Sequence, residues 1–120
     1  MPLQEWSETT LIAQMTDEPF FSEDIEQLDR HLDGAADAMP DVIVDLKSVS
    51  ALNSSNLAQL LKLRTKLRAA NRRLRICAAG GPVWSVFQIT GLSKFFEFTD
   101  DVSTSLASLQ IAGASDAVTE

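Results

Sequence analysis

Four consecutive polar residues, Asn53-Ser54-Ser55-Asn56, form the part of this sequence best suited to chemistry. They follow a β-branched run at residues 42–46 and precede leucines at helical spacing, which predicts a turn between a strand and a helix. Any of the four can supply an N-cap oxygen to that helix. A phosphate group is also electrostatically favoured at the positive end of a helix. The residues alone therefore leave two compatible interpretations open, a polar N-cap cluster and a phosphorylation site.

Three other residues have side chains that could react or bind. Asp45 ends the predicted strand at 42–46, where carboxylates often line functional crevices of parallel sheets, although it could equally cap N–H groups of the following loop. His31 lies beside Asp29 and Asp33 on an acidic helix, which favours a solvated histidine. Cys77 lies in an apolar strand, which favours a buried and unreactive thiol.

The composition excludes several classes of protein and site. One cysteine cannot form an internal disulfide, and one cysteine with one histidine are too few soft ligands for a structural zinc site. Gly80-Gly81 lacks the lysine of a Walker motif and the frame of a dinucleotide-binding loop. Because no catalytic constellation is present, we expect a protein that is not an enzyme, with no cofactor and no metal.

The length and hydropathy indicate a single cytoplasmic domain. A chain of 120 residues is the size of one domain and can bury a core without disulfides. No apolar run approaches the ~20 residues of a membrane span, so we expect no membrane insertion. The first twenty residues carry acids and no base, so we also expect no signal peptide.

The net charge of −7 conceals three blocks of different sign. Residues 1–45 carry twelve acids and one base, residues 46–96 carry nine bases and no acid, and residues 97–120 carry five acids and no base. The acidic flanks argue against direct binding of nucleic acid. The bases of the predicted second helix could pair with the acidic first helix or contact an acidic partner. They are Lys62, Arg64, Lys66 and Arg68.

The order of the predicted elements indicates an α/β fold. Strands are predicted at 11–15, 42–46, 74–78 and 95–98. Helices are predicted at 23–38, at 57–70, from Pro82 to Gly91, and from about residue 102. Ser22 is the predicted N-cap of the first helix. Asn71 and Gly91 suit the left-handed positions that end the second and third helices. Alternating strands and helices indicate a mostly parallel, four- to five-stranded sheet with about four covering helices. We expect one domain at 1–112 and a disordered tail at 113–120.

The predicted turn and its neighbours resemble the STAS domain of anti-sigma factor antagonists. The run Val42-Ile43-Val44-Asp45-Leu46 and the turn Asn53-Ser54-Ser55-Asn56-Leu57-Ala58 are similar to a strand, an Asp-Ser-Ser/Thr-Gly-Leu-Gly turn and a helix in that family. The similarity continues through the basic helix, the strand at 74–78 and Thr90-Gly91-Leu92. This chain departs from the pattern at Asn53, Asn56 and Ala58, where the family has an acid and two glycines, and in the segment 15–19.

The resemblance implies a STAS fold and a protein-protein interaction switch in bacterial transcription control. The partner would be an anti-sigma factor with serine kinase activity, which would phosphorylate Ser55, and a phosphatase would reverse the modification. Asn53, Ser54 and Asn56 would shape the surface that meets the partner, with Asp45 as a further candidate. The protein would be a monomer or a weak homodimer.

Two other functions stay open at this point. The first is an unmodified STAS scaffold or accessory subunit, in a stressosome-like assembly or with a lipid-transport ATPase. The second is a small-molecule or nucleotide sensor, which the family permits although this sequence carries no phosphate-binding motif.

Overall fold

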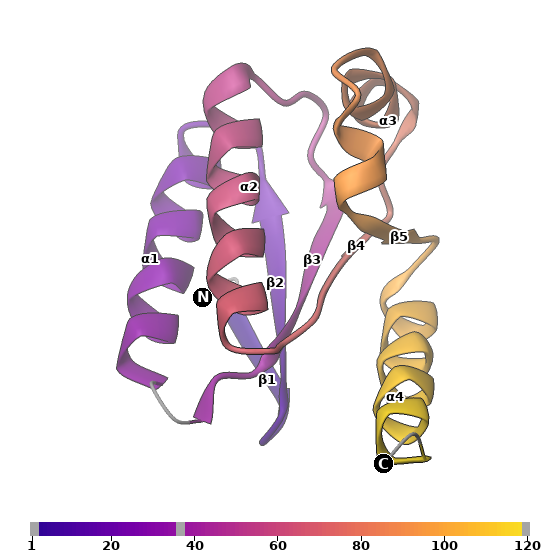
Figure 1. The fold of residues 1–120 in the computed structure, drawn as a ribbon. Coiled ribbons are helices and arrows are strands. Elements are labelled where there is room, and N and C mark those ends of the chain that lie inside the picture. Colours follow the sequence, from indigo (N-terminus) through magenta and orange to yellow (C-terminus); the bar gives the residue numbers. More distant parts are fainter. Residues whose placement is uncertain (1–2, 36–37, 119–120) are drawn as a thin grey trace.

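The computed structural model describes residues 3–35 and 38–118, which form a five-stranded sheet in the order β1-β2-β3-β4-β5 (Figure 1). The strands are β1 (Leu3–Ser7), β2 (Thr10–Thr16), β3 (Asp41–Ser48), β4 (Leu74–Cys77) and β5 (Glu97–Thr99). β2 to β5 are parallel, and β1 pairs antiparallel with β2. The predicted α/β class is therefore confirmed, and β1 is a fifth strand that the sequence pattern did not indicate.

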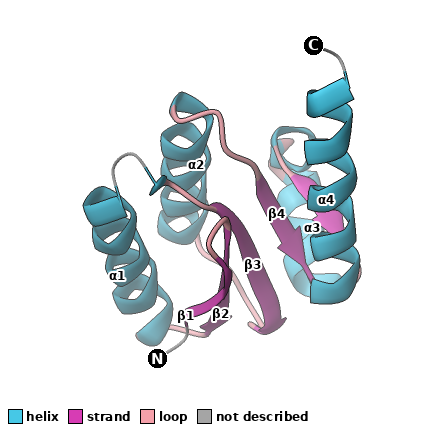
Figure 2. Ribbon diagram, turned by 90° about the horizontal axis from the view of Figure 1, so that it is seen from below, coloured by secondary structure: helices cyan, strands magenta, loops and turns pink. Residues whose placement is uncertain are grey.

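Helices cover both faces of the sheet. They are α1 (Phe20–Ala35), α2 (Ser54–Ala69), α3 (Gly81–Ile89) and α4 (Val102–Val118), and a 3-10 turn η2 (Leu92–Phe95) follows α3. Figure 2 shows α1 and α2 on one side of the sheet and α4 on the other. Among the described residues, no helix is long and apolar enough to cross a membrane.

The central strand β3 explains this layering. Val42, Val44 and Leu46 point into the larger core with α1, α2 and α3, whereas Ile43 packs with Cys77 and Leu109 under α4. Because successive side chains of a strand point to opposite faces, a strand covered on both sides must be apolar throughout. The continuous apolar run at 42–46 follows from this requirement.

The start of α1 differs from its prediction. The helix begins at Phe20, directly after Pro19, so Ser22 lies inside the first turn and is not the N-cap. Glu18 supplies the capping oxygens, because its carboxylate accepts hydrogen bonds from Ser22 N at 2.7 Å and Ser22 Oγ at 2.6 Å. The helix ends at Ala35, and residues 36–37 of the predicted span lie outside the described residues.

Two elements near the C-terminus also differ from expectation. The strand predicted at 95–98 begins at Glu97, because Phe95 belongs to the 3-10 turn. α4 continues to Val118 and so includes residues 113–118, which we expected in the tail. Residues 119–120 lie outside the described part of the chain.

Both predicted left-handed positions are present. Asn71 has φ 58° and Gly91 has φ 75°. After α2, the N–H of Arg72 donates to Leu67 O at 2.8 Å, which satisfies a carbonyl of the last turn. The chain thereby reverses sharply from α2 into β4.

Candidate functional site

The Asn53–Asn56 turn is held by a reciprocal pair of hydrogen bonds. Asn56 N donates to Asn53 Oδ1 at 2.8 Å, and Asn53 N donates to Asn56 Oδ1 at 3.1 Å. This is a capping box in which both residues are asparagine. Ser54 and Ser55 are the first two residues of α2, and both are exposed to solvent. The turn therefore presents two hydroxyl groups on a fixed backbone.

The side-chain amide of Asn56 faces the protein and not the solvent. Asn56 is only 1% exposed, and its Nδ2 lies 3.3 Å from Glu18 Oε2 and 3.3 Å from Gln59 Oε1. Gln59 Nε2 in turn donates to Ser22 Oγ at 3.2 Å. Asn56 would thus affect a partner contact only indirectly, because its hydrogen bonds connect the start of α2 to the start of α1.

The loop before the turn is anchored by Asp17. Its carboxylate accepts hydrogen bonds from Ser50 Oγ at 2.6 Å, from Ser50 N at 2.8 Å and from Ala51 N at 3.4 Å. The hydrogen bonds from Ser50 lower the pKa of Asp17, and those from Ser22 lower the pKa of Glu18. Both carboxylates are therefore charged at neutral pH and border the turn with negative charge.

Asp17 and Glu18 are site residues that the sequence interpretation missed. In the sequence, the segment 15–19 stands out only as a departure from the family pattern. Its role becomes visible in the fold, where the loop after β2 lies against the loop after β3 because the two strands are parallel neighbours. The sequence signal that could have indicated this contact is the pair of adjacent acids just after a predicted strand.

Asp45 occupies a different place from the serine turn. Its side chain is 8% exposed, and its Oδ1 accepts a hydrogen bond from Lys47 N at 2.9 Å, as in the capping interpretation. It lines a groove of about 450 Å³ with side chains from β2, β3 and the start of α1, and this lining includes none of residues 53–56. The groove lined by Asp45 is therefore separate from the serine turn, and a role for Asp45 at a partner surface stays a prediction.

The other two reactive side chains do not form a catalytic group. Cys77 is fully buried, and burial, followed by the charge of Asp45, raises the pKa of its thiol to about 11. His31 lies on α1 with Nε2 3.9 Å from Glu5 Oε1 and is partly exposed. In the part of the chain that the structure describes, no group of three His, Cys, Asp or Glu side chains is placed to hold a metal ion.

With this geometry established, comparison with known proteins decides the family. Residues 9–105 match the STAS domain family, which covers the sheet from β2 to β5 and the candidate turn. This chain belongs to the STAS family. A comparison with curated proteins found no match.

Solved structures share the fold of this STAS domain at low sequence identity. A STAS domain anti-sigma factor antagonist from Planctomyces limnophilus is 13% identical with a TM-score of 0.77, over 90% of this chain and 96% of that chain. A serine-to-glutamate variant of RsbS from Moorella thermoacetica is 11% identical with a TM-score of 0.76, over 94% and 99%. The Bacillus cell fate determinant SpoIIAA in its phosphorylated form is 18% identical with a TM-score of 0.66, over 88% and 96%.

Proposed function

We propose that this STAS domain is a phosphorylation-regulated, non-enzymatic switch of the anti-sigma factor antagonist type, acting in the bacterial cytoplasm. It binds an anti-sigma factor with serine kinase activity, Ser55 accepts the phosphate, and a phosphatase removes it. The single observation that supports this proposal best is the exposed Ser55 hydroxyl in the first turn of α2, on a backbone fixed by the capping box.

The position of Ser55 makes modification compatible with the fold. Ser55 is exposed to solvent at a helix N-terminus, where a phosphate is favoured by the helix dipole. The turn is held by bonds from Asn53, Asn56 and Glu18, and the loop before it by Asp17; none of these bonds uses the Ser55 side chain. Phosphorylation should therefore leave the domain folded and act on the contact with the partner.

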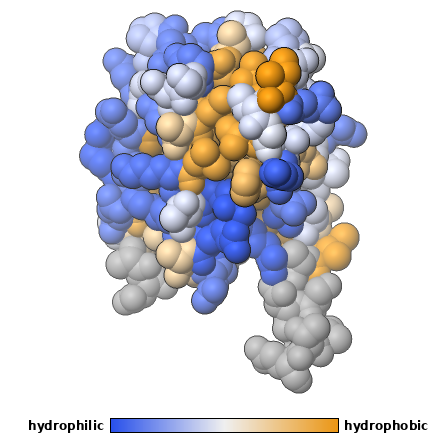
Figure 3. Space-filling model, turned by 45° about the horizontal axis from the view of Figure 1, so that its top comes forward, coloured by the Kyte–Doolittle hydropathy of each residue, from blue (hydrophilic) through white to orange (hydrophobic). Residues whose placement is uncertain are grey.

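An apolar surface at the same end of the molecule supports a protein partner. The N-terminus of α2 and helix α3 both lie at the upper end of the molecule in Figure 1. Figure 3, which brings this end forward, shows apolar side chains gathered between hydrophilic ones. Ile89 at the end of α3 is 84% exposed. Exposed apolar surface bordered by polar groups is typical of protein interaction sites.

The charge on a phosphate would oppose docking at such a surface. A phosphoserine carries roughly −1.5 to −2 charges and a bulky hydration shell. A loss of about 2–4 kcal/mol at the interface would weaken binding by ~30- to 1,000-fold. Asp17 and Glu18, both charged, already place negative charge beside the turn, so an acidic partner surface would meet further repulsion.

The test is phosphorylation by anti-sigma factor kinases with ATP, followed by intact mass measurement and site mapping. Ser55→Ala should abolish the mass increase, whereas the neighbouring Ser54→Ala should retain it. Ser55→Asp should weaken binding of the unmodified kinase partner by ~30-fold or more with an unchanged circular dichroism spectrum. Phosphate on Ser54 alone, or full affinity of Ser55→Asp, would contradict the proposal. Binding without modification would favour an unphosphorylated scaffold.

A further inference from the structure

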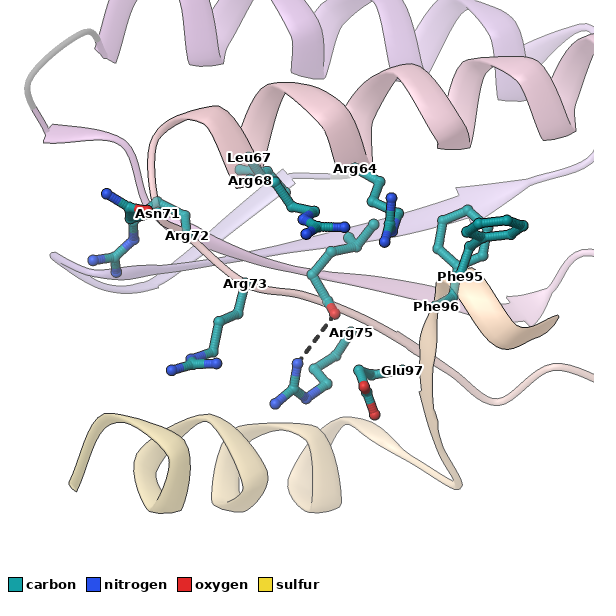
Figure 4. Close-up of a pocket in the computed structure, with 11 residues that line it drawn as sticks. Arg64, Leu67, Arg68, Asn71, Arg72, Arg73, Arg75, Phe95, Phe96 and Glu97 are labelled. Carbon is teal, nitrogen blue, oxygen red and sulfur yellow. Dashed lines mark hydrogen bonds between the residues drawn. The ribbon is translucent and has the colours of Figure 1, made fainter. Parts of the chain in front are cut away.

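A second concave surface lies away from the serine turn, beside the C-terminal half of α2. It is a groove of about 570 Å³ between α2, the start of β4 and residues 95–97, and we call it the arginine groove. Its charged lining is a single acid, Glu97, and the five arginines Arg64, Arg68, Arg72, Arg73 and Arg75. Figure 4 shows Arg64 and Arg68 extending from α2 and Arg75 extending from β4 toward α4, so that the groove runs along the edge of β4 between the two helices.

Tertiary contacts hold the chain at the two arginines that precede β4. Arg72 Nε lies 3.2 Å from Asp41 Oδ1, and its Nη2 donates to Thr9 O at 3.1 Å. The same Asp41 oxygen accepts a hydrogen bond from Arg73 N at 2.8 Å. One carboxylate at the start of β3 thus holds the side chain of Arg72 and the backbone of Arg73. Fixed donors lose little conformational entropy when they bind a ligand.

Arg75 and Arg64 are also held by neighbouring groups. Arg75 Nε donates to Ser108 Oγ of α4 at 2.8 Å, and its Nη1 donates to Leu74 O at 3.2 Å, the bond drawn in Figure 4. Arg64 lies over the ring of Phe95, with Cζ 5.5 Å from the ring centroid. These contacts satisfy part of each guanidinium and leave further donors on both, since a guanidinium has five N–H groups.

The positive charge of the groove exceeds its negative charge. Among the described residues, the ion pairs include one between Arg72 and Asp41 but none with Arg64, Arg68 or Arg75. Arg68 is exposed at the rim. Burial lowers the pKa of Arg75, and the nearby charges of Glu97 and Asp41 offset this effect only in part, so its positive charge is poorly solvated where it lies. An anion in the groove would compensate this charge.

We propose that the arginine groove binds a small anion with two or more linked phosphate groups, such as a nucleoside diphosphate or an inorganic polyphosphate. Guanidinium groups bind phosphate oxygens through paired hydrogen bonds, and several linked phosphates can meet several arginines at once. The volume of the groove is in the range of small-ligand sites.

A long nucleic acid fits these observations less well than a small anion. The whole chain carries a net charge of −7, and its acidic residues lie outside the basic middle of the sequence. A polyanion that extended beyond the groove would meet this negative surface, whereas a small ligand would contact mainly the arginines. The groove is also separate from the serine turn, because its lining contains none of residues 53–56.

The test is titration of the purified protein with inorganic triphosphate and with ADP at low ionic strength, followed by calorimetry and by amide NMR shifts. We expect binding, with shifts confined to residues 64–75 and 95–97. Arg68→Gln should weaken binding about tenfold or more, because it removes charge-assisted hydrogen bonds. Arg64→Gln serves as a second variant, and circular dichroism verifies folding of both.

A matched control separates the groove from general charge attraction. Arg30→Gln removes one exposed arginine on α1, outside the groove, and should change the dissociation constant by less than about twofold. Ser55→Ala should bind triphosphate as the wild type does, so the result does not depend on the proposed switch. Tighter binding of ADP than of triphosphate would identify an organic ligand, and the reverse an inorganic one.

Three outcomes would overturn the inference. The first is absence of binding by both phosphates at low ionic strength. The second is equal weakening by Arg68→Gln and Arg30→Gln. The third is tighter or equal binding of a different ligand. This ligand would be citrate, bound as tightly as triphosphate, or a thymidine oligonucleotide, bound more tightly than triphosphate through the same arginines.

Discussion

The buried side chain of Asn56 joins α2 to Glu18, which lies 38 residues earlier in the chain; its Nδ2 is 3.3 Å from Glu18 Oε2. The same side chain accepts a hydrogen bond from Asn53 N through its Oδ1. One asparagine therefore caps the helix and connects it to the segment that starts α1. Glycine at this position, which the family pattern has, could make neither contact.

Replacing Asn56 should destabilise the domain. Asn56→Ala removes the acceptor of Asn53 N and leaves Glu18 with fewer partners, so the free energy of unfolding should fall by about 1–3 kcal/mol. Urea denaturation followed by circular dichroism measures this change. Ser54→Ala, at an exposed neighbouring position, should change it by less than about 0.5 kcal/mol. Equal stability of the two variants would show that the Asn56 contacts contribute nothing.

Acid should loosen the loop that precedes the serine turn. The pKa of Asp17 is lowered below its usual 3.8 by hydrogen bonds from Ser50, so its ionised form is favoured in the folded state. Its contribution to stability is therefore complete above its unfolded pKa and is lost as pH falls through the lower folded value. In Asp17→Asn, the free energy of unfolding should fall less than in the wild type as the pH drops below about 4. Urea denaturation at several pH values measures this difference.

A control for the pH measurement is available on α1. Glu26→Gln removes one carboxylate from an exposed position and should leave most of the acid sensitivity in place. A steeper pH dependence in Asp17→Asn than in the wild type would contradict the assignment, because the sign of the effect would be reversed.

Two lysines of α2 should differ in their effect on stability. Lys66 Nζ lies 2.5 Å from Asp29 Oδ1 and 2.5 Å from Asp33 Oδ1, and the Lys66 side chain is 21% exposed. Lys62 Nζ lies 3.9 Å from Asp29 Oδ2, and the Lys62 side chain is 73% exposed. Lys66→Met should lower the free energy of unfolding by about 1 kcal/mol, and Lys62→Met by less than about 0.5 kcal/mol. Added salt should reduce the difference in thermal unfolding between them. The interpretation fails if Lys62→Met is the more destabilising variant.

Cys77 should be unreactive in the folded protein. Burial raises the pKa of its thiol to about 11, so little thiolate is present at neutral pH. Alkylation by iodoacetamide, followed by mass spectrometry, should be slow in buffer and rapid in urea. Rapid labelling without denaturant would show that the strand under α4 opens. Cys77→Ser, which retains a small polar group, tests whether the labelled site is this residue.

The order of strands and helices from β2 to α4 follows from local properties of the sequence. The apolar run at 42–46 indicates a strand covered on both faces, and the leucine spacing after Asn56 indicates a helix, because these periods reflect which side chains face the core. Asn71 and Gly91 were identifiable because few residues tolerate a left-handed backbone. β1 was missed, since only Leu3 of its side chains is partly buried and its pattern carries little apolar signal.

Individual side-chain contacts could not be predicted from these local patterns. Ser22 has the residue type of an N-cap, yet Glu18 performs this role because the chain enters α1 directly after Pro19. Asp45 is a candidate for the partner surface because it ends a predicted strand of a parallel sheet. Side-chain alternation along β3 instead places Asp45 on the opposite face from the apolar residues that pack with α2.

The sequence by itself determined the α/β order of strands and helices, the serine turn and the basic middle block, because each is a local pattern of residue types. Only the tertiary structure decided that Asp17 and Glu18 hold the serine turn and that Lys66 pairs with α1, while five arginines line a common groove. These contacts are made between segments that are distant in the sequence. Parallel strand pairing and the sharp reversal after α2 bring those segments together. The spacing of residues along the chain does not predict such contacts, because they depend on which strands become neighbours in the sheet.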